Sequence, residues 1–259
     1  MGSSRVIIKA TGISQQFNVG EEIVTPIKEA NFELMESSFN IIYGPSGSGK
    51  STLLNILTGL QKPSSGTVTF DGHEVYKLSP DELAFFRATR LGIVYQNNYW
   101  IKSLNAVENV SIPLYFLGYS RQRATEVAAY ALEQVGMQDY AKKYPVLLSG
   151  GEQQRIAMAR ALASSPLFII ADEPTGSLDS TNGDKIMEIL RTAQQENRRT
   201  VILVTHNMEY LPLADHLLHI EDGRIQELQH DSITQATNAL FDQMRQRIDR
   251  LSAARKDKA

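Results

Sequence analysis

The chain has 259 residues and no cysteine. This absence excludes disulfide bonds, thiolate metal sites and cysteine nucleophiles, and it suits a reducing compartment such as the cytosol. Long apolar runs are also missing. The longest uncharged stretches, residues 37–49 and 109–120, fall short of the ~20 apolar residues that a membrane-spanning helix needs. Residues 1–10 do not have the pattern of a signal peptide.

The chain has no excess of positive charge either. It carries 26 Lys and Arg against 29 Asp and Glu, a net charge of −3 with an isoelectric point near 6.0. No nucleic-acid partner is therefore expected, because binding to a phosphate backbone favours a basic surface. Hydrophobic residues make up 42% and charged residues 21%, which is typical of a folded globular protein with a sizeable core.

Short apolar runs alternate with longer helical patterns, which predicts an α/β fold with a largely parallel sheet. Three runs, 39–43, 167–171 and 201–204, are continuously apolar, as expected of central strands covered on both faces. The run 67–70 alternates and leads into Asp71-Gly72, which predicts an antiparallel hairpin at the periphery. The expected strands are 5–8, 39–43, 67–70, 91–95, 167–171, 200–205 and 217–220.

No strand-like run occurs between residues 105 and 163, whereas 124–135 and 152–162 have helical spacing. We therefore expect a helical subdomain over 97–164, inserted into a sheet core of 1–96 and 165–229. A last helix is expected to begin at Ser232, with Gln235 completing a capping box, so that 230–259 form a helix and tail. Packing on its own domain is the favoured reading of its apolar stripe over a partner-binding helix; the stripe comprises Ile233, Ala236, Leu240, Met244, Ile248 and Leu251.

A glycine-rich loop follows the expected strand 39–43 and precedes a helical pattern. It has the form G-x-x-x-x-G-K-S, in which Gly47 and Gly49 allow backbone N–H groups to turn toward a polyphosphate. Lys50 is placed to contact the β- and γ-phosphates and Ser51 to coordinate Mg²⁺. A dinucleotide motif is excluded because Thr52 stands where its last glycine would be. The expected phosphate-binding residues are Gly44, Pro45, Ser46, Gly47, Ser48, Gly49, Lys50, Ser51 and Thr52.

Two carboxylates follow the apolar run 167–171. Asp172 and Glu173 stand at its end and Pro174 breaks the strand. Successive residues of a strand point in opposite directions, so two roles are expected. Asp172 suits the Mg²⁺ shell beside a phosphate loop, whereas Glu173 suits a general base that orients water toward the γ-phosphate.

Polar residues end two further strands. His206 follows 200–205, where it either hydrogen-bonds a γ-phosphate or caps the next helix; its position alone leaves both open. Gln96 follows 91–95. Ligands of open α/β sheets bind at the carboxyl ends of strands, so Glu173, His206 and Gln96 are expected to meet at one site with Asp172 and the glycine-rich loop.

A second candidate anion site lies at the start of the expected helix 152–162. Ser149 is a good N-cap, and Gly150 and Gly151 allow close approach to the backbone. Glu152 follows directly. Taken alone, this segment is more simply interpreted as a helix cap.

At this point the chain resembles the nucleotide-binding subunit of ABC transporters over residues 5–228. Residues 44–51 match the Walker A loop, Gln96 the Q-loop, 148–152 the signature and 167–172 Walker B. Glu173 matches the catalytic base, 177–179 the D-loop and His206 the switch histidine. The resemblance thus implies that Glu173, His206 and Gln96 are catalytic and that Ser51, Gln96 and Asp172 are metal ligands. The motifs look like the branch that serves lipoprotein release, macrolide export, antimicrobial-peptide resistance and cell division. The departures are Glu152 in place of the commoner Gln, and Ser37-Ser38 in place of Gly-Glu.

The resemblance implies that ATP and Mg²⁺ bind between two copies of the chain arranged head to tail. Ser149, Gly150, Gly151 and Glu152 of one copy, together with Asp179, would complete the site at the Lys50 of the other. Phe17 stands where the family has an aromatic residue that stacks on adenine.

The resemblance also implies an integral membrane partner and a place on the cytoplasmic face of the plasma (inner) membrane. The partner would dock in a groove near Gln96, for which Tyr99 and Trp100 are candidates, although an aromatic pair is more often core. Dimer closure on ATP would then move the separate membrane subunit, in transport or in the transmission of mechanical force.

Three other functions remain as alternatives. A soluble ABC ATPase that remodels nucleic acid or ribosomes usually carries a second cassette or a long coiled-coil insertion, for which this chain has no room. An unrelated P-loop kinase leaves residues 148–152 unexplained. A zinc hydrolase would have to use His216 and His219, which have no acidic residue between them and belong to an expected strand.

Overall fold

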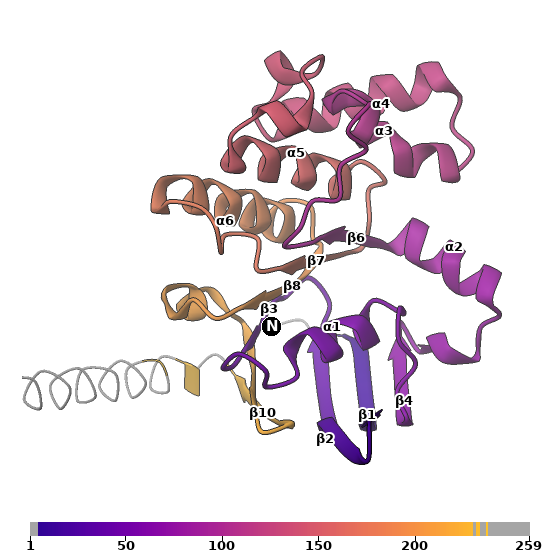
Figure 1. Cartoon of the computed structure of the whole chain (residues 1–259), viewed down its shortest axis with the longest axis vertical. Coiled ribbons are helices and arrows are strands. Elements are labelled where there is room, and N and C mark those ends of the chain that lie inside the picture. Colours follow the sequence, from indigo (N-terminus) through magenta and orange to yellow (C-terminus); the bar gives the residue numbers. More distant parts are fainter. Residues whose placement is uncertain (1–4, 230–231, 234–236, 238–259) are drawn as a thin grey trace, which may run out of the picture.

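The computed structural model describes residues 5–229, 232–233 and 237, and it contains two sheets (Figure 1). The larger sheet has the strand order β10-β9-β3-β8-β7-β6, in which all strands are parallel except β10. Its strands are β3 (Phe39–Tyr43), β6 (Leu91–Val94), β7 (Phe168–Asp172), β8 (Thr200–Thr205), β9 (His216–Glu221) and β10 (Arg224–Gln229). The largely parallel α/β sheet is therefore confirmed.

The smaller sheet is antiparallel, with the order β2-β1-β4-β5. The hairpin at Asp71-Gly72 is confirmed, since it joins β4 to β5. The strand expected at residues 5–8 is much longer, because it continues as β1 and turns back as β2. Polar residues and several register shifts interrupt the alternation of β1 and hide it in the sequence. The strands are β1 (Val6–Val19), β2 (Glu22–Met35), β4 (Ser65–Phe70) and β5 (His73–Glu74).

The central strands are covered on both faces, as their apolar sequences predict. In β7, Phe168 and Ile170 belong to the core shared with the antiparallel sheet and α1 (Lys50–Leu57). Ile169 and Ala171 belong to the core on the other face, beneath the helices. In Figure 1, α5 and α6 lie on one side of the large sheet and α1 on the other. Burial of alternate residues on both faces fixes the strand register.

The chain between β6 and β7 is helical, as expected. Predicted helices 124–135 and 152–162 correspond to α4 and α5, each with a serine N-cap. The helices α2, α3 and α6 were not predicted individually from the sequence. The α-helices are α2 (Pro80–Arg90), α3 (Ala106–Phe116), α4 (Arg121–Gln134), α5 (Gly150–Leu162) and α6 (Ser180–Gln195); short 3-10 segments are η1 (Val75–Lys77), η2 (Gln138–Tyr140), η3 (Pro145–Leu147) and η4 (Met208–Leu213).

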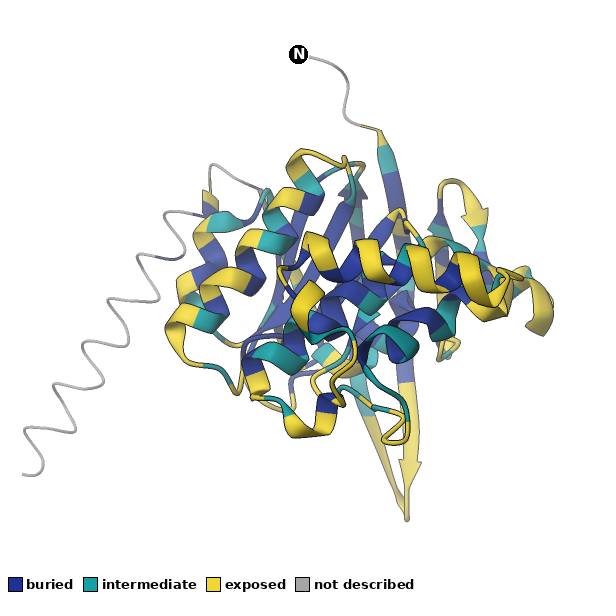
Figure 2. Ribbon diagram, turned by 90° about the horizontal axis from the view of Figure 1, so that it is seen from above, coloured by how far each residue is buried: buried dark blue, intermediate teal, exposed yellow. Residues whose placement is uncertain are grey.

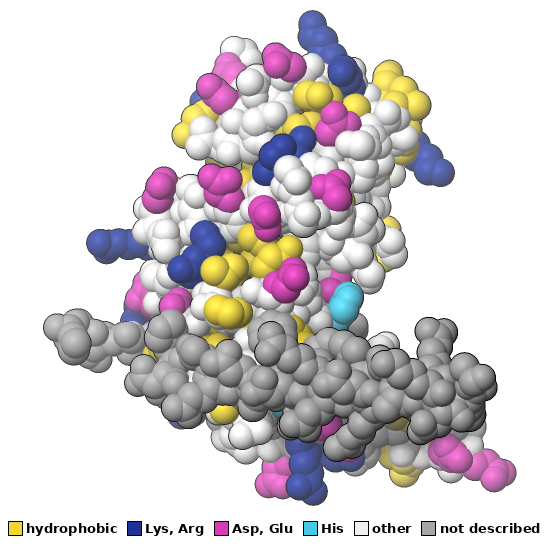
Figure 3. Space-filling view, turned by 90° about the vertical axis from the view of Figure 1, so that its left-hand side faces the viewer, with side chains coloured by type: hydrophobic (Ala, Val, Ile, Leu, Met, Phe, Trp, Pro, Cys, Tyr) yellow, Lys and Arg dark blue, Asp and Glu magenta, His cyan; other side chains and the backbone are white. Residues whose placement is uncertain are grey.

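The tip of the β1–β2 hairpin is exposed and projects from the body of the molecule (Figure 2). On the face shown in Figure 3, acidic and basic side chains are interspersed. None of the helices over the described residues is both long and apolar enough to span a membrane. Of the expected last helix, Ser232 and Ile233 are helical and Ile233 is buried in the core; Gln235, Ala236 and the stripe from Leu240 onward lie outside the described residues.

Candidate nucleotide-binding site

Residues from several strand ends meet in one pocket of about 560 Å³. The strands β3, β8, β7 and β6 are consecutive neighbours in the sheet, so their carboxyl ends lie side by side. The predicted convergence is thereby confirmed. Pro26 is an addition from β2, missed because the long β1–β2 hairpin was not recognised. The lining residues are Pro26, Ser46, Gly47, Gly49, Lys50, Ser51, Thr52, Gln96, Asp172, Glu173 and His206.

The loop between β3 and α1 depends on its glycines. Gly49 has a φ of 111°, and a Cβ there would lie 2.3 Å from the carbonyl oxygen of Pro26. Gly47 has a φ of 78° but faces open space. Gly44 is confined differently, since a Cβ would lie 2.1 Å from the carbonyl oxygen of Ile220. Only glycine fits at Gly44 and Gly49 without a backbone shift, which holds the loop against β2 and β9.

The loop presents donors suited to a polyphosphate. The Lys50 ammonium donates to the carbonyl oxygens of Gly44 and Pro45, at 2.8 Å each, and it also lines the pocket. Pro45 and Ser46 are exposed, whereas the buried Ser48 hydroxyl has no hydrogen-bond partner. These groups stand at the N-terminus of α1, where free backbone N–H groups favour an anion. The residues present therefore fit a nucleotide phosphate.

Asp172 and Glu173 share the pocket instead of pointing in opposite directions, which corrects the expectation from strand alternation. The strand ends at Asp172, and Glu173 adopts the left-handed backbone conformation, with a φ of 46°. The Glu173 N–H donates to the Val204 carbonyl oxygen at 2.9 Å, which holds this turn against β8. Burial raises the pKa of Asp172, and the Glu173 charge raises it further, against the opposing effect of Lys50.

His206 contacts Glu173 directly. Its Nδ1 lies 2.8 Å from Glu173 Oε1, while the Thr205 hydroxyl donates to Glu173 Oε2 at 3.4 Å. The alternative role of His206 as a helix cap is wrong, because Asn207 caps η4 with its own side chain. Thr205 was missed by sequence reasoning; its only signal is a hydroxyl next to the histidine at the end of β8.

The predicted cap at Ser149 is confirmed. The Ser149 hydroxyl accepts from the Glu152 N–H, and the Glu152 carboxylate accepts from the Ser149 N–H at 2.9 Å, forming a capping box at α5. The hydrogen bond from the Ser149 backbone lowers the pKa of Glu152. Ser149 and Gly150 are exposed, and neither is among the residues that line the pocket of their own chain.

Gly151 and Asp179 hold the start of α5 against the start of α6. A Cβ at Gly151 would lie 2.7 Å from the side chain of Asn182, so glycine permits this approach. Asp179 caps α6 by accepting from the Asn182 N–H at 2.9 Å, which lowers the pKa of Asp179. Arg155 donates to Asn182 Oδ1 at 3.2 Å. Neither Gly151 nor Asp179 lines the pocket of its own chain.

The three aromatic candidates have different surroundings. Phe17 is 40% exposed on β1, opposite Val24 of β2, and does not line the pocket. Tyr99 is 72% exposed and has a positive φ of 48°. Trp100 is partly buried and hydrogen-bonded to Gln153 of α5. Tyr99 is therefore the more exposed of the two residues proposed for a partner groove.

The chain also fits a divalent cation next to a bound phosphate. Ser51, Gln96 and Asp172 line the same pocket and offer oxygen atoms, the donors that Mg²⁺ prefers. Within 5–229, 232–233 and 237 no group of three His, Asp or Glu side chains is arranged to hold a metal by itself. A cation here would share its shell with substrate phosphates, as is usual for Mg²⁺.

Comparison with known proteins agrees with this geometry. A family model described as "ABC transporter" matches residues 27–176. An uncharacterised ABC transporter ATP-binding protein of Methanocaldococcus jannaschii is 40% identical over 85% of this chain and 95% of that protein. The macrolide export ATP-binding/permease protein MacB of Vibrio parahaemolyticus is 40% identical over 86% of this chain and 34% of that longer protein. The predicted likeness to the branch that includes macrolide export is confirmed.

Solved structures give the same result. The dimeric structure of MJ0796, described as a bacterial ABC transporter cassette, has a TM-score of 0.81 at 39% identity. A post-hydrolysis state of that cassette, bound to ADP and Pi, has a TM-score of 0.81 at 38% identity; each alignment covers 86% of this chain and 99% of the other. The chain therefore belongs to the family of ABC transporter ATP-binding proteins, the cassettes that bind and hydrolyse ATP.

Proposed function

We propose that this chain binds ATP with Mg²⁺ in the pocket at the carboxyl ends of β3, β8, β7 and β6. Lys50 and the loop N–H groups would bind the β- and γ-phosphates. Ser51, Gln96 and Asp172 would hold the Mg²⁺, which when bound neutralises charge that develops on the phosphoryl group. The observation that carries the proposal is the convergence of all these residues in one pocket.

Glu173 is the general base in this proposal. Its carboxylate lines the pocket and is held at both oxygens, by His206 at 2.8 Å and by Thr205 at 3.4 Å. A base must be oriented before it can direct a water molecule in line with the γ-phosphate. Asp172 has a different task, because its carboxyl interacts electrostatically with the Lys50 ammonium and would help to hold the cation.

A second copy of the chain would complete each site. The exposed Ser149 and Gly150 stand at the N-terminus of α5, away from the pocket of their own chain. A helix N-terminus capped by serine suits the γ-phosphate of a nucleotide held elsewhere. Gly151, Glu152 and Asp179 would accompany them at the interface, and Phe17 on the β1–β2 hairpin would stack on adenine. The dimer of MJ0796 supports this arrangement.

The chain would act on a separate integral membrane subunit. MacB relatives join an ATP-binding part to a permease part in one protein, which supports such an association here. The exposed ring of Tyr99, three residues after Gln96, marks the surface where we propose that the partner docks. The chain would then lie on the cytoplasmic face of the plasma (inner) membrane, and dimer closure on ATP would move the partner.

A turnover assay tests the proposed chemistry. The purified chain should hydrolyse ATP only when Mg²⁺ is present, and Glu173→Gln should lower turnover by about 10²- to 10⁴-fold while ATP binding remains. Size-exclusion chromatography with ATP should show the Glu173→Gln variant as a dimer. Unchanged turnover in Glu173→Gln would contradict the role of that carboxylate.

A capture experiment tests the proposed partner. Tagged chain should recover an integral membrane protein from solubilised membranes, and Tyr99→Ser should reduce that recovery. Phe85→Ser serves as the control, because Phe85 is also exposed, at 67%, but stands on α2. Recovery of nucleic acid or ribosomes in place of a membrane protein would favour the remodelling alternative.

A further inference from the structure

The indole of Trp100 lies against α5, on the segment that follows Gln96. Its Nε1–H donates to Gln153 Oε1 at 2.8 Å, and the guanidinium of Arg160 lies 4.6 Å from the ring centroid. Arg160 also donates to the Asn98 carbonyl oxygen at 2.6 Å. Three contacts therefore fasten residues 98–100 to one helix, and they include a cation–π pair and a hydrogen bond from a charged donor.

Gln153 extends this connection to the signature segment. Its Nε2–H donates to the carbonyl oxygen of Leu148 at 3.0 Å, and Leu148 directly precedes Ser149. The amide of Gln153 thus accepts from Trp100 with one atom and donates to Leu148 with the other. A planar amide bonded at both ends fixes the distance between its partners, because it cannot rotate without losing one of the bonds.

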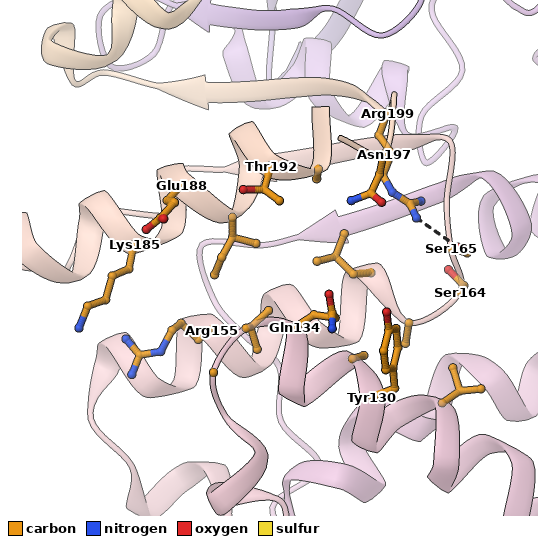
Figure 4. Close-up of a pocket in the computed structure, with 18 of the residues that line it drawn as sticks. Tyr130, Gln134, Arg155, Ser164, Ser165, Lys185, Glu188, Thr192, Asn197 and Arg199 are labelled. Atoms are coloured by element: carbon orange, nitrogen blue, oxygen red, sulfur yellow. Dashed lines mark hydrogen bonds between the residues drawn. The ribbon is translucent and has the colours of Figure 1, made fainter. Parts of the chain in front are cut away.

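The opposite face of α5 borders a cavity. Gln153 and Arg160 are seven residues apart and share one face, whereas Arg155 and Leu162 occupy the other. Arg155 and Leu162 border a cavity of about 700 Å³ between α4, α5 and α6. Figure 4 shows Arg155 on one side of this cavity, and Lys185, Glu188 and Thr192 of α6 on the other.

We infer that Trp100 and Gln153 are positioning residues that join Gln96 and Ser149 of the same chain. The inference rests on the proposed function, in which Gln96 contacts the nucleotide of its own chain and Ser149 that of the second copy. The Trp100–Gln153 hydrogen bond then transmits the position of Gln96 in one site to the Ser149 corner of the other. Through this bond, the nucleotide bound in one composite site changes the position of Ser149 in the other composite site.

Kinetics of Trp100→Phe test the inference. The phenyl ring can remain beneath Arg160, and the substitution removes the indole N–H together with the five-membered part of the ring. The ATP concentration for half-maximal turnover should rise roughly 2- to 10-fold, the range that one hydrogen bond accounts for. Merely structural damage would lower kcat through loss of folded protein and leave that concentration unchanged. Gln153→Leu removes the acceptor of the same hydrogen bond. Gln122→Leu is its matched control, since Gln122 donates to Glu126 on the exposed face of α4.

Fluorescence supplies a second readout, because Trp100 is the only tryptophan of the chain. Its emission should change on addition of Mg²⁺ and ATP with the same half-saturation as turnover. In Gln153→Leu the emission should be shifted to longer wavelength before nucleotide is added, and Gln122→Leu should behave like the wild type.

Two results would overturn the inference while leaving the proposed function intact. One is a wild-type chain that turns over ATP with no change in Trp100 emission. The other is a Trp100→Phe chain with an unchanged half-maximal ATP concentration. A wild-type chain that neither binds nor hydrolyses ATP would instead refute the proposed function.

Discussion

The imidazole of His206 is hydrogen-bonded to the carboxylate of Glu173, with 2.8 Å between Nδ1 and Oε1. The histidine side chain is 66% exposed and the glutamate side chain only 12%. The pair thus joins an exposed ring at the end of β8 to a mostly buried carboxylate at the end of β7. His206 can orient Glu173 and still reach a ligand in the pocket that both residues line.

Removal of the imidazole should release Glu173 while leaving the fold intact. His206→Ala should lower ATP turnover by roughly 10²-fold, the size of effect that misplacement of a catalytic group produces. Nucleotide affinity should change much less, which single-turnover assays and equilibrium binding will separate. His216→Ala is the control, because His216 makes a similar contact with Glu227 outside the pocket. Equal losses in both variants would contradict a specific role for His206.

The capping box of α5 has a close counterpart at α2, where Ser79 and Glu82 form the same set of bonds. Ser149→Ala and Ser79→Ala should each cost about 1 kcal/mol of stability through loss of the cap. Only Ser149→Ala should also lower ATP turnover, by roughly 10- to 100-fold, because it removes a donor to a charged phosphate. Urea denaturation and turnover assays will check both effects. An equal loss of turnover in Ser79→Ala would show that Ser149→Ala acts only through loss of a helix cap, and this would contradict a phosphate-binding role for Ser149.

Two glycines of the phosphate loop should differ in their tolerance of alanine. Gly47→Ala should cost about 1–2 kcal/mol, the penalty of a left-handed backbone for a residue with a Cβ. Gly49→Ala should cost more, since it adds a clash with the Pro26 carbonyl oxygen. Urea denaturation without nucleotide measures both. Equal costs would show that β2 does not confine the loop at Gly49.

The raised pKa of Asp172 predicts a pH-dependent effect on stability. As pH rises, the unfolded chain releases this proton first, so the native state loses stability between the unfolded and folded pKa values. The Asp172→Asn variant has no such proton to release. Its free energy of unfolding, relative to that of the wild type, should therefore rise as pH increases between the unfolded and folded pKa values of Asp172. Asp179→Asn should change in the opposite direction, because the pKa of Asp179 is lowered in the folded chain. Urea midpoints over a pH series will show the two trends; trends of one sign would contradict this account of the two carboxyls.

Much of the site could be predicted because its chemistry is local in sequence. The phosphate loop, Asp172, Glu173 and the Ser149 cap each follow from a strand end or a helix start. The parallel sheet then brings the ends of β6, β7 and β8 together. The contacts that escaped prediction are tertiary: Pro26 reaches the pocket from a distant hairpin, and no pattern near Trp100 reveals its bond to Gln153.

Two features were misjudged for identifiable physical reasons. The long β1–β2 hairpin was seen only in part, because bulges break its alternation. Asp172 and Glu173 share a pocket because the strand ends at Asp172 and Glu173 adopts the left-handed backbone conformation, which breaks the alternation at that residue. Alternation predicts directions only within a regular strand.

The central claim is that each nucleotide site is built from two chains, with Lys50 from one and Ser149 from the other. Lys50→Ala and Ser149→Asp should each be inactive alone, the latter because a carboxylate keeps the cap but repels phosphate. In a mixed dimer, one site receives both lesions and the other receives neither.

The most direct measurement is therefore the ATP turnover of an equimolar mixture of these two variants. Random pairing gives mixed dimers in half of the molecules, each with one intact site, so the account predicts recovery of about one quarter of wild-type turnover. A mixture that stays as inactive as its components would contradict a site shared between two copies.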